Sequence, residues 1–170
     1  MLCSKKFDYL QSFARQIQRA RKERGLSREE LAEKAAVHPN TIGVAERAER
    51  DLNVLTQTRI LAVLGCGEMR IYDDVYFACT GDGVPSPTRT DILAMRDAQI
   101  IRDIGKAIRD RRLVMDLRLE DVAQMAGLHI NSVWNCERGL VVPDGNTVFR
   151  LYRVLGVSRL VAGERGLRLD

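Results

Sequence analysis

Two stretches of the chain carry the residues best suited to specific recognition, "HPNTIGVAER" at 38–47 and "HINSVWNCER" at 129–138. Each places an asparagine, Asn40 or Asn131, in the first turn of an expected helix. An asparagine amide carries a hydrogen-bond donor and an acceptor side by side, so it could bind a partner that presents the complementary pair. Asparagine is also common near helix starts, so a structural role stands beside this interpretation.

The sequence offers little for other chemistry. It has no glycine-rich phosphate loop, nucleophile elbow or metal-binding cluster, so we expect no enzyme activity, metal or cofactor. The cysteines Cys3, Cys66, Cys79 and Cys136 lack the short spacing of a metal or redox motif. We therefore expect four reduced thiols in a cytosolic protein.

Apolar runs such as "ILAVLGC" are too short to cross a bilayer, and the first residues do not read as a signal peptide. We therefore expect a cytoplasmic, nucleoid-associated protein that avoids membranes. The net charge of +4 permits nucleic-acid binding without requiring it. Residues 1–66 carry +4 and residues 104–170 carry +3, whereas residues 67–103 carry −3. Such a pattern suits two DNA-facing units joined by a segment that avoids phosphate.

The two stretches belong to a longer internal repeat. When the chain is shifted by 91 residues, positions 17–65 align with 108–156 without a gap, and 15 of 49 positions are identical. Two copies are too few for a solenoid, so we infer a duplicated small domain. The predicted organisation is a first domain at 5–66, a connector at 67–90, a second domain at 91–157 and a tail at 158–170.

Each copy reads as a series of helices. In the first copy, one helix has Phe13, Ile17, Ala20 and Arg24 on one face and stops at Gly25. Ser27 and Glu30 then form a capping box for a helix at about 28–34. The next helix begins with Pro39, a favoured residue at the first helical position, and "NVLTQTRILAVLG" continues the helical pattern.

The connector breaks this pattern. "IYDDVYFACT" is aromatic and β-branched, which favours a short strand, and "GDGVPSPT" reads as a loop. We expect Thr90 to cap a long helix from Asp91 to about Arg112. The tail "SRLVAGERGLRLD" could pair with the connector strand or mediate dimer contacts.

The spacing within each copy resembles the lambda-repressor-like (Cro/CI, XRE) helix-turn-helix family. The positions that carry this resemblance are Ala32, Ala36, Val37, Ile42 and Ala45 in the first copy and Ala123, Gly127, Leu128, Val133 and Cys136 in the second. It covers 49 positions twice and implies a mainly α fold of two tandem five-helix domains, with a short connector suited to a β-strand. Ala36 departs from the glycine usual in the turn, where a left-handed conformation costs ~1–2 kcal/mol.

The resemblance also implies roles for individual residues, because the second helix of the family's motif enters the major groove. The implied base-reading residues are Pro39, Asn40, Gly43, Val44, Ile130, Asn131, Trp134 and Asn135. The implied phosphate contacts are Ser27, Arg28, Thr41, Arg47, Arg50, Arg118, Ser132 and Arg138. The family's ion pair between the first and third helices corresponds to Arg21–Glu46 and Arg112–Glu137.

Several of these residues have a second interpretation. Trp134, the only tryptophan, should point outward because Val133 and Cys136 take the inward positions, but a large aromatic side chain also suits core packing. His38 and His129 stand where helix caps are expected, so we predict caps or phosphate contacts rather than catalysis.

The resulting hypothesis is a sequence-specific double-stranded DNA-binding transcriptional regulator of repressor type. Its recognition helices are predicted at about 39–47 and 130–138, and one chain would act as a pseudo-dimer on two unlike half-sites ~34 Å apart. A homodimer would span a longer operator. The alternative is a protein-interaction module of the same fold, of antitoxin or anti-repressor type, with a protein partner, because Gly43 and Val44 are weak base readers.

Overall fold

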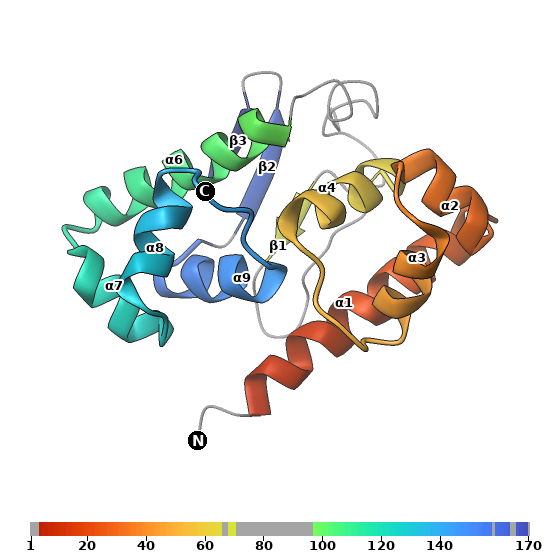
Figure 1. Cartoon of the computed structure of the whole chain (residues 1–170), viewed down its shortest axis with the longest axis horizontal. Helices are drawn as coiled ribbons and strands as arrows, with labels where there is room; N and C mark the ends of the chain where they lie inside the picture. The colour runs from red at the N-terminus through yellow and green to blue at the C-terminus, as the bar shows by residue number, and fades with distance from the viewer. Residues whose placement is uncertain (1–3, 66–67, 71–96, 158, 164–165, 170) are drawn as a thin grey trace.

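The computed structural model describes residues 4–65, 68–70, 97–157, 159–163 and 166–169, and these residues are mainly helical (Figure 1). The first half contains α1 (Ser4–Glu23), α2 (Arg28–Ala35), α3 (Pro39–Glu46) and α4 (Val54–Val63). The second half contains α6 (Asp97–Val114), α7 (Leu119–Ala126), α8 (Ile130–Glu137) and α9 (Gly145–Val154). Three strands complete the described fold, β1 (Glu68–Arg70), β2 (Arg159–Gly163) and β3 (Gly166–Leu169).

The two halves follow the same backbone path. Helices α3 and α8 begin and end 91 residues apart, and so do α4 and α9. Left-handed residues recur at the same offset, in the pairs Gly25/Asp116, Ala36/Gly127, Ala48/Gly139 and Gly65/Gly156. Ala36 therefore does adopt the strained conformation, at φ 52° and ψ 45°, where the second half has glycine.

The described residues contain four helices in each half, whereas the resemblance implied five. The next described element after α4 is β1, and the next after α9 is β2. The predicted strand in "IYDDVYFACT" and the predicted cap at Thr90 lie outside the described residues. Within them, α6 runs from Asp97 to Val114, two residues beyond the expected end at Arg112.

A small antiparallel sheet joins the connector to the tail, in the strand order β1-β2-β3. Strand β1 pairs with β2 in a register that puts Met69 opposite Leu160, and β2 forms a hairpin with β3. The tail therefore pairs with connector residues 68–70, whereas the connector strand expected at 71–80 lies outside the described residues. Strand β3 packs against α6 (Figure 1).

Each half buries its own apolar core. The first half buries Phe13, Ile17, Leu31, Ile42 and Ile60, and the second half buries Ile104, Ile108, Val122, Val133 and Leu151. Arg24, predicted on the inner face of the first helix, is instead exposed, and its guanidinium donates to the Ala20 carbonyl at 3.0 Å. A charged head group remains in water while its aliphatic stem follows the helix.

The halves also bury residues in each other. The Phe149 ring, from α9, stacks on Tyr9 in the first-half core with ring centroids 5.0 Å apart. Val54, from α4, belongs to the second-half core. These exchanged apolar contacts join the two cores into one folded body.

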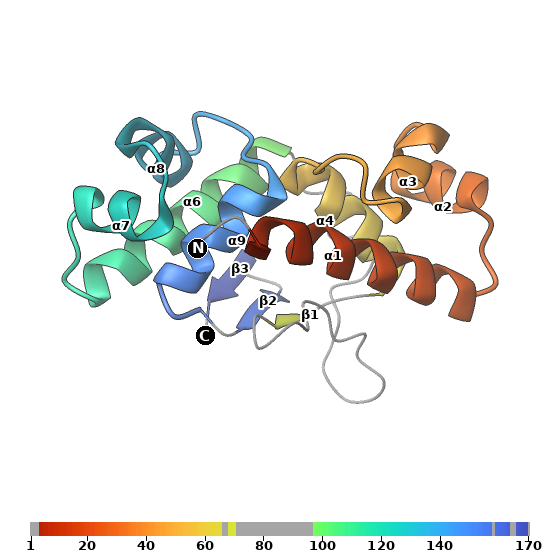
Figure 2. The ribbon, with the colours of Figure 1, turned by 90° about the horizontal axis from the view of Figure 1, so that it is seen from below.

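Backbone hydrogen bonds between the halves obey a twofold relation. The Val54 N–H donates to the Pro143 carbonyl at 2.9 Å, and the Gly145 N–H donates to the Leu52 carbonyl at 3.0 Å. Adding 91 to Val54 and Leu52 gives Gly145 and Pro143, so the same two positions meet from both sides. As a result, α3 and α8 lie on one face of the molecule, opposite the sheet (Figure 2).

Candidate nucleic-acid interface

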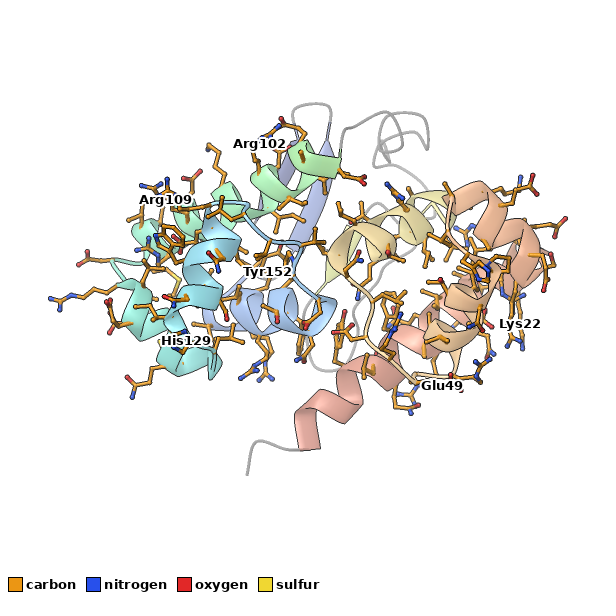
Figure 3. All side chains as sticks on the ribbon, viewed as in Figure 1. Lys22, Glu49, Arg102, Arg109, His129 and Tyr152 are labelled. Carbon is orange, nitrogen blue, oxygen red and sulfur yellow. The ribbon has the colours of Figure 1, made fainter. Side chains whose placement is uncertain are left out.

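Local capping fixes where each helix of the motif begins. Ser27 accepts from the Glu30 N–H at 3.0 Å while the Glu30 carboxylate accepts from the Ser27 N–H at 2.7 Å, which is the predicted capping box. His38 and His129 are the N-caps of α3 and α8, and each Nδ1 accepts a backbone N–H from two residues later at 3.2 Å. Figure 3 shows His129 near the junction between α7 and α8.

Both ion pairs implied by the resemblance are present. Arg21 donates to the two carboxylate oxygens of Glu46 at 2.5 and 3.1 Å, and Arg112 donates to those of Glu137 at 2.6 and 2.9 Å. Arg21 also donates to the Leu26 carbonyl. One pair therefore ties α1 to the end of α3, and the other ties α6 to the end of α8.

Glu46 has a second cationic partner, Arg28, whose Nε donates to it at 2.7 Å. Burial alone would raise the pKa of Glu46, but hydrogen bonds from Arg21 and Arg28 outweigh burial and lower it. Arg28, implied as a phosphate contact, is thus already engaged with a carboxylate.

The implied base-reading residues differ in their exposure. Pro39, Asn40, Asn131 and Trp134 are exposed, whereas Val44 and Asn135 are half-buried. Ile130 is also half-buried, and it packs against the second-half core. The two asparagines therefore occupy equivalent, accessible positions in the first turns of α3 and α8.

Gly43 was predicted to face outward, but it is buried. The reason is that the Arg47 guanidinium folds back over it, so that a Cβ at Gly43 would lie 2.9 Å from Arg47 Nη1. Arg47 is held there by Glu49, with Nε–Oε1 at 2.5 Å and Nη2–Oε2 at 3.0 Å. Figure 3 shows Glu49 at the edge of the molecule beyond α3.

Trp134 lies on the surface of α8 rather than in the core, with 41% of the residue exposed. The Arg138 guanidinium lies over its ring, 4.9 Å from the centroid. A guanidinium above an indole face is a favourable cation–π arrangement. The core-packing interpretation of Trp134 is therefore wrong, and its ring and Arg138 form one exposed unit.

The remaining implied phosphate contacts are also placed by the fold. Ser27, Arg50 and Arg118 are exposed, and Thr41 and Ser132 are half-buried. Arg118 stands at the N-cap of α7, where its backbone N–H donates to Asp121 at 2.8 Å.

Cys136 is the free cysteine of the described residues, and burial raises the pKa of its thiol to about 11.

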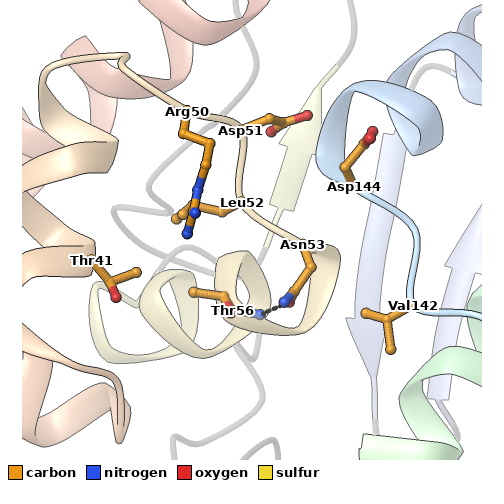
Figure 4. A pocket seen from close by; sticks show the side chains of 8 residues that line it. All are labelled: Thr41, Arg50, Asp51, Leu52, Asn53, Thr56, Val142 and Asp144. Atoms are coloured by element: carbon orange, nitrogen blue, oxygen red, sulfur yellow. Dashed lines mark hydrogen bonds between the residues drawn. The ribbon is translucent and has the colours of Figure 1, made fainter.

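A hollow of about 420 Å³ lies between the halves. It is lined by Thr41, Arg50, Asp51, Leu52, Asn53, Thr56, Val142 and Asp144, and Arg50 points into it (Figure 4). Asn53 accepts from the Thr56 N–H at 2.9 Å, and Asp144 accepts equivalently from the Thr147 N–H at 2.6 Å. Sequence analysis singled out Thr41 and Arg50 of this lining but missed Asn53 and Asp144, although two polar N-caps at the repeat offset were a usable signal.

Comparison with known proteins identifies part of this chain. Residues 17–69 match a family model described as "Helix-turn-helix", so this segment is a helix-turn-helix domain of the XRE/Cro/CI type. No curated protein and no solved structure matches the chain significantly.

None of the helices among the described residues is long and apolar enough to cross a membrane. Nor do those residues contain a cluster of three or more side chains suited to holding a metal ion.

Proposed function

We propose that this protein is a sequence-specific double-stranded DNA-binding transcriptional regulator of repressor type, and that the second half is a second helix-turn-helix unit. The domain match at residues 17–69 supports the first statement. The recurrence of α3 and α4 as α8 and α9, with matching caps and ion pairs, supports the second.

The observation that carries this proposal is the twofold pairing of the halves. Reciprocal bonds between 52–54 and 143–145 hold the two units in a fixed orientation, with α3 and α8 on one face (Figure 2). Two recognition helices related by a twofold axis suit successive major grooves of one duplex. One chain would thus bind as two subunits of a dimer do.

The half-sites of such an operator should differ. Helix α3 offers Pro39, Asn40 and Val44, whereas α8 offers Asn131, Trp134 and Asn135. Both asparagines suit an adenine, but the remaining side chains have different shapes and hydrogen-bonding groups. An operator with one shared element and unlike flanks is the expected target.

Selection of bound sequences from a random duplex library at physiological salt tests this function. Enrichment of a motif with two unlike half-sites about one helical turn apart would support it. Failure to enrich any motif, with only weak and salt-sensitive binding, would contradict it.

Substitution then tests the assigned helices. Asn131→Ala and Asn40→Ala should each weaken operator binding and relax the preference at one base pair, because each removes a base contact worth ~1–3 kcal/mol. Binding to an unrelated duplex should not change, since phosphate contacts remain. Unchanged operator affinity in both variants would remove these helices from base reading.

A protein-interaction module of the same fold is the second candidate. It is favoured by exposed apolar side chains at the outer end of the second half, Leu113, Val114, Met115 and Met125. The corresponding residues of the first half are Lys22, Glu23, Arg24 and Lys34, so the fold itself does not require apolar residues there. Absence of any selected DNA motif would favour this candidate.

A further inference from the structure

Equivalent arginines at the ends of the two recognition helices have different neighbours. Arg47, the C-cap of α3, is bound through two nitrogens to the Glu49 carboxylate. Arg138, the C-cap of α8, stacks on Trp134 instead, and no carboxylate of the described residues forms a salt bridge with it. The difference follows from sequence, because Leu140 stands where the first half has Glu49.

A second pair of positions shows the same asymmetry. Arg28 in the first half binds the buried Glu46, whereas Leu119 takes its place in the second half. The second half has instead Arg118, exposed and one residue earlier, where the first half has Ser27. No salt bridge joins Arg118 to a carboxylate among the described residues.

Whether an arginine is already bound to a carboxylate matters when the partner is a polyanion such as DNA. A cation that neutralises a phosphate releases condensed counterions from DNA, which supplies much of the binding free energy. An arginine already bound to a carboxylate adds little net positive charge, and its partner carboxylate would lie close to the phosphates. Arg50 is exposed in the first half, but it points into the hollow between the halves (Figure 4).

Trp134 gives Arg138 a further advantage. A guanidinium stacked on an indole ring has fewer conformations to lose when it binds a phosphate. In the first half, Gly43 stands at the position of Trp134, and it has no side chain to orient Arg47.

We infer that the two halves contribute unequally to DNA binding, with the second half supplying most of the affinity through phosphate contacts by Arg138, oriented by Trp134, and by Arg118. The first half then contributes mainly the adenine contact of Asn40 and the orientation of the pair. This inference rests on the proposed function.

The test compares matched substitutions in the full chain, Arg138→Ala and Arg47→Ala, on the selected operator duplex. Fluorescence anisotropy with a labelled duplex is measured at several salt concentrations. Arg138→Ala should weaken binding about tenfold and reduce the slope of log K against log salt by about 1. Arg47→Ala should cause a clearly smaller loss and a smaller change of slope.

A gain of function provides the complementary variant. Glu49→Leu copies the second half into the first and frees Arg47, so it should strengthen binding and steepen the salt dependence. Both arginines and Glu49 are exposed, so all three variants should fold, which circular dichroism and thermal melting would verify. Equal losses from Arg47→Ala and Arg138→Ala, or no gain from Glu49→Leu, would overturn the inference.

The single tryptophan reports separately on the second half. Intrinsic fluorescence of Trp134 should change on addition of the operator, and Trp134→Leu should weaken binding less in the Arg138→Ala background than alone. Equal effects of Trp134→Leu in both backgrounds would contradict the orienting role. If the wild-type chain bound no duplex at all, the proposed function itself would fail, and that result is distinct from equal contributions of the halves.

Discussion

At the scale of single residues, a buried ion pair sets how two helices of the first half are oriented. The Glu46 side chain is 0% exposed and the Arg21 side chain 10% exposed, so each charge is compensated mainly by the other rather than by water. Replacing such a pair with apolar residues can be neutral, but removing one partner leaves a buried charge without compensation. The pair therefore orients α1 and α3 more than it adds net stability.

Glu46→Gln should lower the free energy of unfolding by about 3 kcal/mol at neutral pH, because Arg21 loses its buried counter-charge. The wild-type pKa of Glu46 is lowered from its ordinary value of 4.5, so the stability it supplies is present above that pH. This contribution is lost as the pH falls below about 4.5 and through the folded-state pKa. Urea unfolding at several pH values should show a shallower acid dependence for Glu46→Gln. An identical dependence would contradict this linkage.

Tyr152→Phe should leave the protein equally stable or slightly more stable. Tyr152, on α9, is fully buried, its hydroxyl has no hydrogen-bond partner among the described residues, and burial raises its pKa. Removing an unsatisfied hydroxyl removes a desolvation cost. Tyr9→Phe is the matched control, because the Tyr9 hydroxyl accepts from Gln57 at 2.8 Å and its loss should cost about 1 kcal/mol. Thermal melting of both variants distinguishes these outcomes.

At the scale of elements, the halves differ where α1 contacts α3 and where α6 contacts α8. Gly105 in α6 lies against the end of α8, where a Cβ would overlap the backbone carbonyl oxygens of Cys136 and Glu137. The corresponding residue of α1 is the buried Ala14. The backbones of α6 and α8 are therefore in direct contact at Gly105, and a side chain there would require one of the helices to move.

Gly105→Ala should destabilise the protein by about 1–3 kcal/mol despite the better helix propensity of alanine, because backbone cannot yield as a side chain does. Gly43→Ala is the matched control in α3, since its Cβ would meet only the flexible end of Arg47. That control should gain up to about 1 kcal/mol from helix propensity. Chemical denaturation measures both. Equal effects of the two substitutions would show that the α6–α8 contact is not tight.

At the scale of the whole molecule, the pairing of the halves decides whether α3 and α8 can act together. Gly145 lies at the centre of this pairing, and a Cβ there would overlap the side chains of Gln57 and Tyr9. Asp51 also accepts from the Asn146 N–H at 2.7 Å across the same boundary. Small changes here should alter the relative orientation of the halves.

Gly145→Ala should lower stability by about 1–3 kcal/mol through overpacking. It should also weaken the proposed operator binding, because α3 and α8 lose their relative orientation. Arg59→Ala is the control at the same boundary. Its ion pair with Asp97 is partly exposed, at 32% and 46% of the side chains, so its loss should cost less than about 1 kcal/mol. Melting temperature and operator affinity are measured together. Full operator affinity in Gly145→Ala would contradict a role for this boundary in binding.

Much of the local structure was predictable from particular residues. Ser27 with Glu30 indicated a helix start and Pro39 indicated another, whereas the left-handed turn at Ala36 was implied by the family resemblance. The helix-start signals act within a few residues of the chain, so the sequence contains them directly. The expectation of a fifth helix came from the family resemblance rather than from local residues, and the described residues contain four helices in each half.

The sequence by itself determined the repeat and the helices of each copy, because capping and periodicity are short-range or repeated signals. The residues of both buried ion pairs were implied by the family resemblance. Only the tertiary structure decided that Val54 and Gly145 meet around a twofold axis, that Arg47 covers Gly43 and that Arg138 stacks on Trp134. Those arrangements depend on which surfaces come together and which side-chain partner is nearest. Both are set by packing in three dimensions rather than by separation along the chain.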